Sequence, residues 1–236
     1  MRRLRRAGPQ LLKGGWVFIS PKMARIVFLI DGFNLYHALD NSPVHLRPWI
    51  DPHRYRRFKW LNLAKLCQCY AIEKGDTIEA VLYFTALAYW NPGKVARHQR
   101  YIRALENEGL SVVYGEFKER QKRCVRCRQY FTTHEEKQTD VNIAVTLFRL
   151  AVENKYDKAI VISGDSDILP AVTLVQKTFL EKKVGVVIPI GKASENFKNT
   201  ADFHYRMREK HLQASSFSDP YTFPDGSTIP CPPLWK

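Results

Sequence analysis

Two aspartates one residue apart follow an apolar run in the segment VISGDSD, which places Asp165 and Asp167 where a buried strand would end. Asp31 follows another apolar run in the same way. Ligands gather outside the carboxyl ends of the strands in an open α/β sheet, so these carboxylates would meet if the two strands were neighbours. Asp140 begins the helical pattern of residues 141–155, whose N-terminus could face the same crevice.

A group of carboxylates has a chemistry that its single members lack. Taken singly, Asp167 could cap the following helix and Asp31 could belong to a turn. Asp140 could cap its own helix or be favoured by the positive end of that helix's dipole. Several carboxylates in one crevice repel one another, so they must take up protons or bind a cation. Oxygen ligands favour hard ions, and we therefore expect Mg²⁺ or Mn²⁺. Such an ion can bridge carboxylates to a phosphodiester oxygen and activate water.

Alternating strand and helix patterns surround these residues. Five short runs are almost continuously apolar, as strands buried on both faces are. These runs are RIVFLI (25–30), AVLYFTA (80–86), LSVVYG (110–115), KAIVIS (158–163) and VGVVIPI (184–190). Helical patterns lie between them at 61–72, 93–109, 141–155 and 168–183. The alternation predicts a three-layer α/β/α sandwich around a mostly parallel sheet.

The expected organisation is one domain with two inserts and two terminal segments. Residues 1–23 form a basic extension, expected to be flexible, that lacks the apolar core of a secretory signal. Residues 24–211 carry the alternating pattern, interrupted by inserts at 42–60 and 117–137. The segment 212–236 is rich in Pro, Ser and aromatic residues, and we expect it to be either disordered or wrapped over the domain.

The composition favours a polyanionic partner. The chain has 37 Lys and Arg against 23 Asp and Glu, a formal net charge of +14 and a sequence pI near 9.6. Nucleic acid and an anionic membrane surface both fit this charge, but no apolar run has the length that a bilayer span requires. A basic surface that only keeps the protein soluble is the plain alternative. A basic exterior around an acidic, metal-binding crevice indicates a nuclease.

The five cysteines are too few and too unevenly spaced for a secreted disulfide framework, so we expect a reducing, cytoplasmic setting. Cys124 and Cys127 could supply two of the four ligands that a structural zinc ion typically takes. His134 could be a third ligand, and Cys231 or one of Cys67 and Cys69 could be a fourth. A partner chain's own pair could instead complete the site. A reduced thiol pair and a redox pair are the alternatives.

Two basic stretches could contact a nucleic acid. The insert at 117–137 contains Arg123, Arg126 and Arg128, which we expect to bind RNA, against the alternative of a solvated loop. The stretch HRYRRFKW (53–60) mixes cations with rings that can stack on the bases of single strands. Its aromatics could equally anchor the insert to the core.

Four motifs together resemble the NYN-domain proteins of the PIN-like nuclease superfamily. They are FLIDGFNLYHAL (28–39), EEKQTDVNIAVTLF (135–148), AIVISGDSDILPAV (159–172) and VGVVIPIGKASENFKNTADFHY (184–205). The resemblance covers roughly residues 24–205. Each motif alone is weak, whereas the set in this order is highly specific. The resemblance implies a Rossmann-like, PIN-like core and a metal-dependent ribonuclease that hydrolyses RNA phosphodiester bonds.

The resemblance also implies residue roles. Asn34 and Ser163 would contact phosphate or hold a carboxylate in place, and Lys137 would contact phosphate or be a solvated lysine. Asp31 and Asp165 would be the firmest metal ligands. The implied catalytic and metal-binding set is Asp31, Asp140, Asp165 and Asp167, with Mg²⁺ or Mn²⁺ as the cofactor.

Other functions fit the residues less well. A phosphatase of the haloacid-dehalogenase type needs a second Asp two residues after the first, where this chain has Phe33. A dinucleotide-binding fold needs a Gly-rich first turn, which DGFNLYHAL lacks. The alternative from another class is an RNA-binding or regulatory module that retained the fold but cleaves weakly. Many nucleases of this resemblance pair up, so a homodimer is a further alternative to a monomer.

Overall fold

A computed structural model describes most of the chain. The expected N-terminal extension lies outside the described residues except for Met23, and so does most of the insert expected at 42–60. The described residues are 23–40, 54–73, 75–192 and 195–236.

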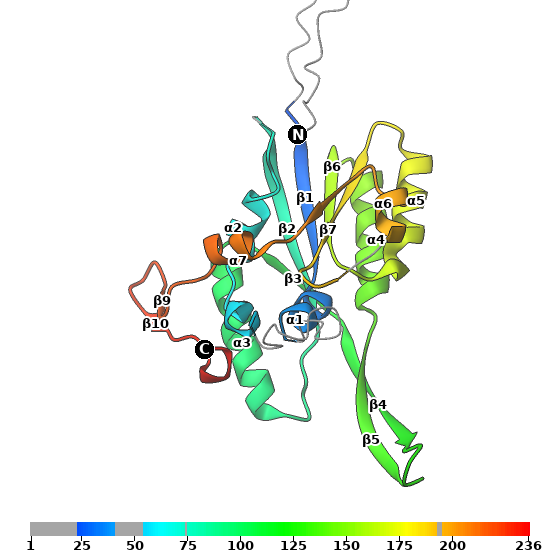
Figure 1. Cartoon of the computed structure of the whole chain (residues 1–236). Helices are drawn as coiled ribbons and strands as arrows, with labels where there is room; N and C mark the ends of the chain where they lie inside the picture. Colours follow the sequence, from blue (N-terminus) through cyan, green and yellow to red (C-terminus); the bar gives the residue numbers. More distant parts are fainter. Residues whose placement is uncertain (1–22, 41–53, 74, 193–194) are drawn as a thin grey trace, which may run out of the picture.

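A six-stranded parallel sheet forms the centre of the fold (Figure 1). Its strands are β1 (Arg25–Asp31), β2 (Thr77–Thr85), β3 (Ser111–Tyr114), β6 (Lys158–Ile162), β7 (Lys183–Ile188) and β8 (Phe203–Arg206). Their order is β3-β2-β1-β6-β7-β8, so the chain first builds outward on one side of β1 and later places β6 on its other side. The expected sheet is confirmed, and β8 adds a strand that the sequence pattern did not predict.

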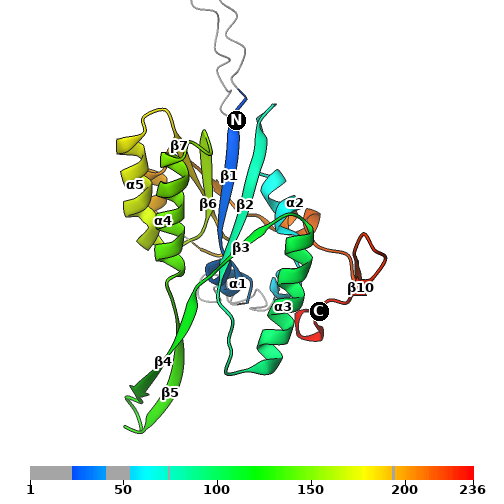
Figure 2. The same ribbon diagram turned by 180° about the vertical axis from the view of Figure 1, so that it is seen from behind.

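Helices cover both faces of this sheet (Figures 1 and 2). One face carries α1 (Gly32–Asp40), α2 (Leu63–Gln68), α3 (Pro92–Asn107) and α7 (Glu209–Ala214). The other carries α4 (Thr139–Val152), α5 (Leu169–Thr178) and α6 (Glu195–Thr200). The expected three-layer sandwich is therefore confirmed. Among the described residues, no helix combines the length and apolar character needed to cross a membrane.

The central strand β1 explains why its sequence is continuously apolar. Successive side chains of a strand point to opposite faces. Ile26, Phe28 and Ile30 accordingly pack into the core under α1, α2 and α3. Val27 and Leu29 pack into the second core under α4 and α5. Both sets are almost fully buried, so β1 is fixed from both sides and its terminal Asp31 has a well-defined position.

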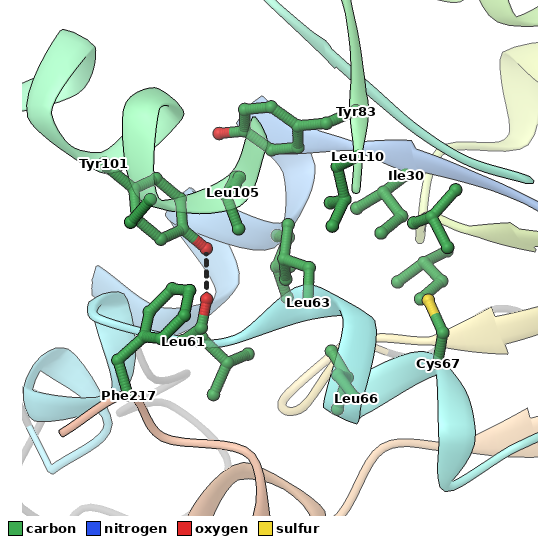
Figure 3. Close-up of a cluster of buried hydrophobic side chains, with 14 of the residues drawn as sticks. Ile30, Leu61, Leu63, Leu66, Cys67, Tyr83, Tyr101, Leu105, Leu110 and Phe217 are labelled. Atoms are coloured by element: carbon green, nitrogen blue, oxygen red, sulfur yellow. Dashed lines mark hydrogen bonds between the residues drawn. The ribbon is translucent and has the colours of Figure 1, made fainter. Parts of the chain in front are cut away.

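The C-terminal segment packs along the α2–α3 face. Phe217, Tyr221 and Trp235 join the first core, where the ring of Trp60 lies 5.4 Å from that of Phe217 between centroids. Figure 3 shows this region, with the Tyr101 hydroxyl donating a 2.8 Å hydrogen bond to the carbonyl of Leu61. The segment also contains β9 (Tyr221–Thr222), β10 (Thr228–Ile229) and the 3-10 turn η4 (Pro233–Trp235). Of the two alternatives for this segment, the structure shows the wrapped one.

The described end of the first insert is anchored in the same way. Phe58 and Trp60 are buried, in and after the 3-10 turn η2 (Arg56–Lys59). The guanidinium groups of Arg54 and Arg57 both reach the carboxylate of Glu209, at 2.6 and 3.2 Å. For residues 54–60, the structure thus favours anchoring to the core over stacking on nucleic-acid bases.

The second insert is an antiparallel hairpin of β4 (Glu116–Arg123) and β5 (Tyr130–Lys137), which projects away from the central sheet (Figure 1). Most of its side chains are exposed. The amino-acid pattern does not predict these strands because neither face of the hairpin is buried, so neither face needs an apolar pattern. The hairpin connects β3 to α4, and its base therefore lies next to the first turn of that helix.

Candidate active site

The carboxyl ends of β1 and β6 lie side by side. Asp31 is the last residue of β1, and Ser163 follows β6 directly. The two strands are parallel neighbours in which Ile30 pairs with Ile162, so the prediction that they are adjacent is confirmed. The next strand along the chain, β2, lies on one side of β1, and the later strand β6 lies on its other side. Ligands of open α/β sheets bind at this kind of topological switch point.

Three carboxylates form a compact group at this edge. Oxygen atoms of Asp140, Asp165 and Asp167 all lie within 4.8 Å of one another. Asp140 stands in the first turn of α4, and the other two belong to the 3-10 turn η3 (Ser166–Ile168) and its cap. Asp140 and Asp165 are half-buried and Asp167 is exposed, so the group opens to solvent. The part of the chain that the structure describes holds one such cluster of potential metal ligands.

Asp31 lies outside this three-carboxylate group but belongs to the same network. It is only 4% exposed. Its Oδ1 accepts a 2.9 Å hydrogen bond from the backbone N–H of Asn34, and its Oδ2 accepts a 2.8 Å bond from the Ser163 hydroxyl. The side-chain oxygen of Asn34 accepts from the N–H of Gly164, and the Ser163 oxygen accepts from the N–H of Asp165. Asn34 and Ser163 therefore tie the end of β1 to the loop after β6.

Helix capping accounts for two of the four aspartates. Asp31 bonds to the first turn of α1, and Asp165 caps η3 by accepting a 3.1 Å bond from the N–H of Asp167. The cap positions of α4 and α5 belong to Gln138 and Ile168, so Asp140 and Asp167 are not caps. The capping role considered for these two residues is wrong. Asp140 still lies in the first turn of α4, where the helix dipole favours a negative charge, whereas no local role accounts for Asp167.

Crowding changes the acidity of the group. Burial, followed by the charges of Asp31 and Asp165, raises the pKa of Asp140 to about 6. Burial also raises the pKa of Asp31, although its hydrogen bonds from Asn34 and Ser163 oppose this shift. A divalent cation would relieve this repulsion, and the donors are carboxylate oxygens, which suit Mg²⁺ or Mn²⁺. The residues present therefore fit such an ion.

Two residues near the acidic group, Glu136 and Lys192, lie outside the set of site residues predicted from the sequence. Glu136 accepts a 3.1 Å hydrogen bond from the N–H of Thr139, and its charge contributes to the raised pKa of Asp140. The stem of Lys192 lies against Gly164: a Cβ added to that glycine would come within 3.0 Å of the lysine Cβ. No pattern in the sequence marks Lys192, which follows β7 and reaches the crevice only through the order of the strands.

Lys137 lies on the opposite face of its strand from Glu136, because adjacent side chains of a strand point in opposite directions. Its ammonium group pairs with Glu135 at 3.2 Å. Glu135 also binds Lys122 at 2.7 Å. The structure therefore gives Lys137 a partner on the hairpin, and Glu135 belongs to this ion-pair network.

The tip of the hairpin carries the remaining predicted residues. Cys124 and Cys127 are free thiols, and Val125 between them is 97% exposed. Arg123 donates a 3.0 Å hydrogen bond to the carbonyl of Arg128 and lies over the ring of Tyr130. Arg126 and Arg128 are exposed, as a nucleic-acid-binding surface requires.

The other zinc ligands considered within this chain do not reach the tip. His134 pairs with Glu119, four pairs from the last one at the tip, which corresponds to roughly 13 Å along the hairpin. Its ring instead stacks on Trp90, 3.7 Å away at an angle of 8°. Cys67 and Cys231 are buried in the core, and Cys69 lies at the C-terminal end of α2, packed against the same core. The expectation that His134 or one of these cysteines completes the site is therefore wrong.

An aromatic cleft of about 310 Å³ adjoins the crevice. It begins at Gly32, the residue after Asp31, and extends between α1, α3 and the base of the hairpin. Trp90, Phe117 and His134 supply rings at its hairpin side. Further residues of the lining include the cations Lys94 and Arg97, and His98, which contacts the hydroxyls of Tyr83 and Thr85.

A family model for the NYN domain matches residues 25–208, the span that contains the central sheet and all four aspartates. The chain belongs to the NYN domain family. The resemblance inferred from the four motifs is thereby confirmed, and the fold is nuclease-like. The C-terminal packing segment lies beyond the matched span.

Two comparisons place this NYN domain among known proteins. It is 28% identical over 213 residues to 6-hydroxy-3-succinoylpyridine 3-monooxygenase HspA of Pseudomonas putida, covering 80% of this chain and 67% of that protein. A solved structure of a protein of unknown function from Vibrio parahaemolyticus matches with a TM-score of 0.51 and 18% identity. That match covers 80% of this chain and 96% of the other, and it shows the fold alone.

Proposed function

We propose that this NYN domain is a metal-dependent ribonuclease that hydrolyses RNA phosphodiester bonds. The observation that carries the proposal is the group formed by Asp140, Asp165 and Asp167, whose oxygens lie within 4.8 Å of one another at the switch point of the sheet. This acidic group lies in a chain with a formal net charge of +14, so the surroundings attract a phosphate backbone while the crevice alone would repel it.

The residues have distinct proposed roles. Asp140, Asp165 and Asp167 would hold Mg²⁺ or Mn²⁺, with Asp31 as the fourth carboxylate of the site. Each oxygen of Asp31 accepts one hydrogen bond and keeps a further lone pair. A bound ion would supply Lewis-acid chemistry and an activated water. Ser163 and Asn34 are positioning residues, because their hydrogen bonds fix Asp31 and the backbone of the loop that carries Asp165.

Two surfaces would receive the RNA. Arg123, Arg126 and Arg128 at the hairpin tip are proposed to contact phosphates, and Lys192 would do so beside the crevice. The aromatic cleft next to Gly32 would accept a base, since proteins recognise unpaired RNA bases largely by stacking them on aromatic rings. Glu136 and His134 lie on the same face of β5, so the base of the hairpin links the acidic group to this cleft.

Cleavage of a labelled single-stranded RNA tests the proposal. The wild-type chain should cut with Mn²⁺ or Mg²⁺ and stop with a chelator. Asp165→Asn should lower the rate by roughly a hundredfold or more, because it removes a ligand and one negative charge. Asp225→Asn is the matched control, since Asp225 is exposed in the turn between β9 and β10. It should leave the rate unchanged.

Other outcomes contradict the proposal. Tight, salt-sensitive binding of RNA without cutting by the wild-type chain would favour the alternative, an RNA-binding or regulatory module that retains the NYN fold. Equal cutting by the wild type and by Asp165→Asn would place the activity elsewhere.

The aromatic cleft favours a second candidate function, the binding of a small aromatic molecule. It is lined by rings with Lys94 and Arg97 beside them, a combination that suits an aromatic carboxylate. The name of the Pseudomonas putida relative specifies such a compound, 6-hydroxy-3-succinoylpyridine. Calorimetric titration of that compound distinguishes the candidates: saturable binding lost in Arg97→Ala would support the small-molecule function, and no binding would leave the cleft to RNA.

A further inference from the structure

The hairpin tip presents its two thiols in a turn that resembles one half of a zinc site. The N–H of Cys124 bonds to the carbonyl of Gln129 at 2.8 Å, and the N–H of Arg128 bonds to the carbonyl of Cys124 at 2.9 Å. The backbone N–H groups of Arg126 and Cys127 point at the sulfur of Cys124, which also contacts the thiol of Cys127. The two sulfurs therefore lie together on the outside of a defined turn.

The same chain offers no completion of this half-site among its described residues. A zinc ion held by thiolates needs four ligands in a tetrahedral arrangement. In the described ranges, no third His, Cys, Asp or Glu lies close enough to form a group with the two cysteines. His134 is stacked on Trp90 in the middle of the hairpin, and the other cysteines lie at the core, with Cys67 and Cys231 buried. The missing ligands must therefore come from elsewhere.

The surface around the thiols is suited to a partner. Val125, Tyr130 and Phe131 are 97%, 69% and 50% exposed, although they are apolar and lie within a few residues of the cysteines. Two identical tips facing each other across a two-fold axis would cover these side chains on both copies and would form a closed assembly. A second copy also supplies two further cysteines in the same geometry.

We infer that two copies of this chain share one Zn²⁺ ion, held by Cys124 and Cys127 of each hairpin tip. Four thiols would lose their protons to solvent on binding, and no oxidation or reduction takes place. Four thiolates around Zn²⁺ carry a net charge of −2. Arg126 and Arg128 lie next to the cysteines in each copy, so their positive charges offset the negative charge of the zinc centre. The negative centre in turn reduces the repulsion between the two basic hairpin tips.

The zinc centre shares no residue with the acidic group of the proposed nuclease, although Arg126 and Arg128 beside the cysteines are also proposed to contact RNA. Asp140 lies in the first turn of α4, just after the end of the hairpin, whereas Cys124 and Cys127 lie in the turn between β4 and β5. Figure 1 shows that this turn is the far end of the hairpin from the central sheet. A change at the tip can therefore remove the zinc centre without touching the acidic crevice. A substitution in the acidic group likewise leaves the cysteines unchanged. Failure of either proposal therefore leaves the other open to test.

The experiment measures zinc content and mass of the full chain, purified under reducing conditions without chelator. Elemental analysis should find one zinc ion for every two chains. Light scattering should find a mass twice the chain mass of 27.5 kDa, and removal of zinc by a chelator should return it to that of one chain. Adding Zn²⁺ back should restore the dimer.

Variants make the assignment specific. Cys127→Ser should lose both zinc and dimerisation while its melting temperature stays close to that of the zinc-free wild type, because the tip is exposed. Cys69→Ser is the matched control, since Cys69 is a half-exposed thiol outside the hairpin. It should retain one zinc ion per dimer.

Three results would overturn the inference. One zinc ion per monomeric chain would show that a single copy completes the site. A reduced protein without zinc would show that the thiols serve another purpose. A dimer that persists in chelator or in Cys127→Ser would show that another surface joins the copies.

Discussion

Asp140 illustrates how a single residue acquires its properties from distant parts of the chain. Its position in the first turn of α4 is ordinary for an acidic residue, because the N-terminus of a helix favours negative charge. Burial and the neighbouring carboxylates nevertheless raise its pKa to about 6. A local preference thus explains why an aspartate is tolerated there, whereas the raised pKa follows from the convergence of β1, η3 and α4.

His98 leads to a prediction about pH and stability. Burial lowers its pKa from 6.5 to about 4, so the folded protein keeps this ring neutral at pH values where the unfolded chain binds a proton. Stability must then fall as the pH drops from 6.5 toward 4, and it is fully present above 6.5. The loss attributable to His98 should reach up to about 3 kcal/mol near pH 4.

Urea unfolding at several pH values tests this prediction. The difference in unfolding free energy between pH 7 and pH 4.5 should be smaller in His98→Gln than in the wild type, because glutamine does not titrate. Identical pH dependence in both proteins would show that His98 is not the group responsible.

At the scale of elements, the C-terminal segment completes a core that the central sheet leaves open. Trp60, Tyr101, Phe217 and Trp235 form one aromatic cluster, with ring centroids between 5.4 and 6.5 Å apart in most pairs. The segment lies beyond the matched family span, yet its rings cover α2 and α3. We therefore expect it to contribute to the stability of the whole domain.

Phe217→Ala should lower the unfolding free energy by about 3 kcal/mol, because it leaves a cavity among buried rings. Thr222→Ala is the matched control, since Thr222 is exposed in the same segment, and it should change stability by less than about 0.5 kcal/mol. Denaturant titration measures both. Equal stability of Phe217→Ala and the wild type would mean that the segment contributes little to the core.

At the scale of the whole molecule, the net charge of +14 should govern the proposed binding of RNA. Each phosphate contact releases condensed counterions, so the logarithm of the affinity should fall with the logarithm of the salt concentration. About four contacts to a single strand would give a slope of roughly −3. Filter binding of RNA by Asp165→Asn at rising salt measures this slope without cleavage.

The control for this measurement is an uncharged-backbone analogue of the same base sequence. It should bind with almost no salt dependence, because it has no phosphate charge to neutralise. An affinity for RNA that does not change with salt concentration would contradict electrostatic binding. It would favour binding through base stacking in the aromatic cleft.

The alternation of buried strands and helices could be predicted from the amino-acid sequence, because strands buried on both faces need continuously apolar runs such as residues 25–30 and 158–163. The sequence also marked the aspartates that follow those runs. The hairpin at 116–137 escaped prediction because its exposed faces impose no apolar pattern. The packed C-terminal rings gave no periodic signal either.

Which of these residues lie together depends on the order of the elements in the folded chain. The strand order places β6 beside β1, and that adjacency brings Asp165 next to the end of β1, 134 residues away in the chain (165 minus 31). The same order of elements places Asn34 and Ser163 against Asp31, and Lys192 against Gly164. It also leaves the two thiols of the hairpin tip without a third potential metal ligand among the described residues. The spacing of apolar residues reflects which side of each strand or helix is buried. It carries no information on which strands become neighbours, and the contacts between distant side chains depend on that order.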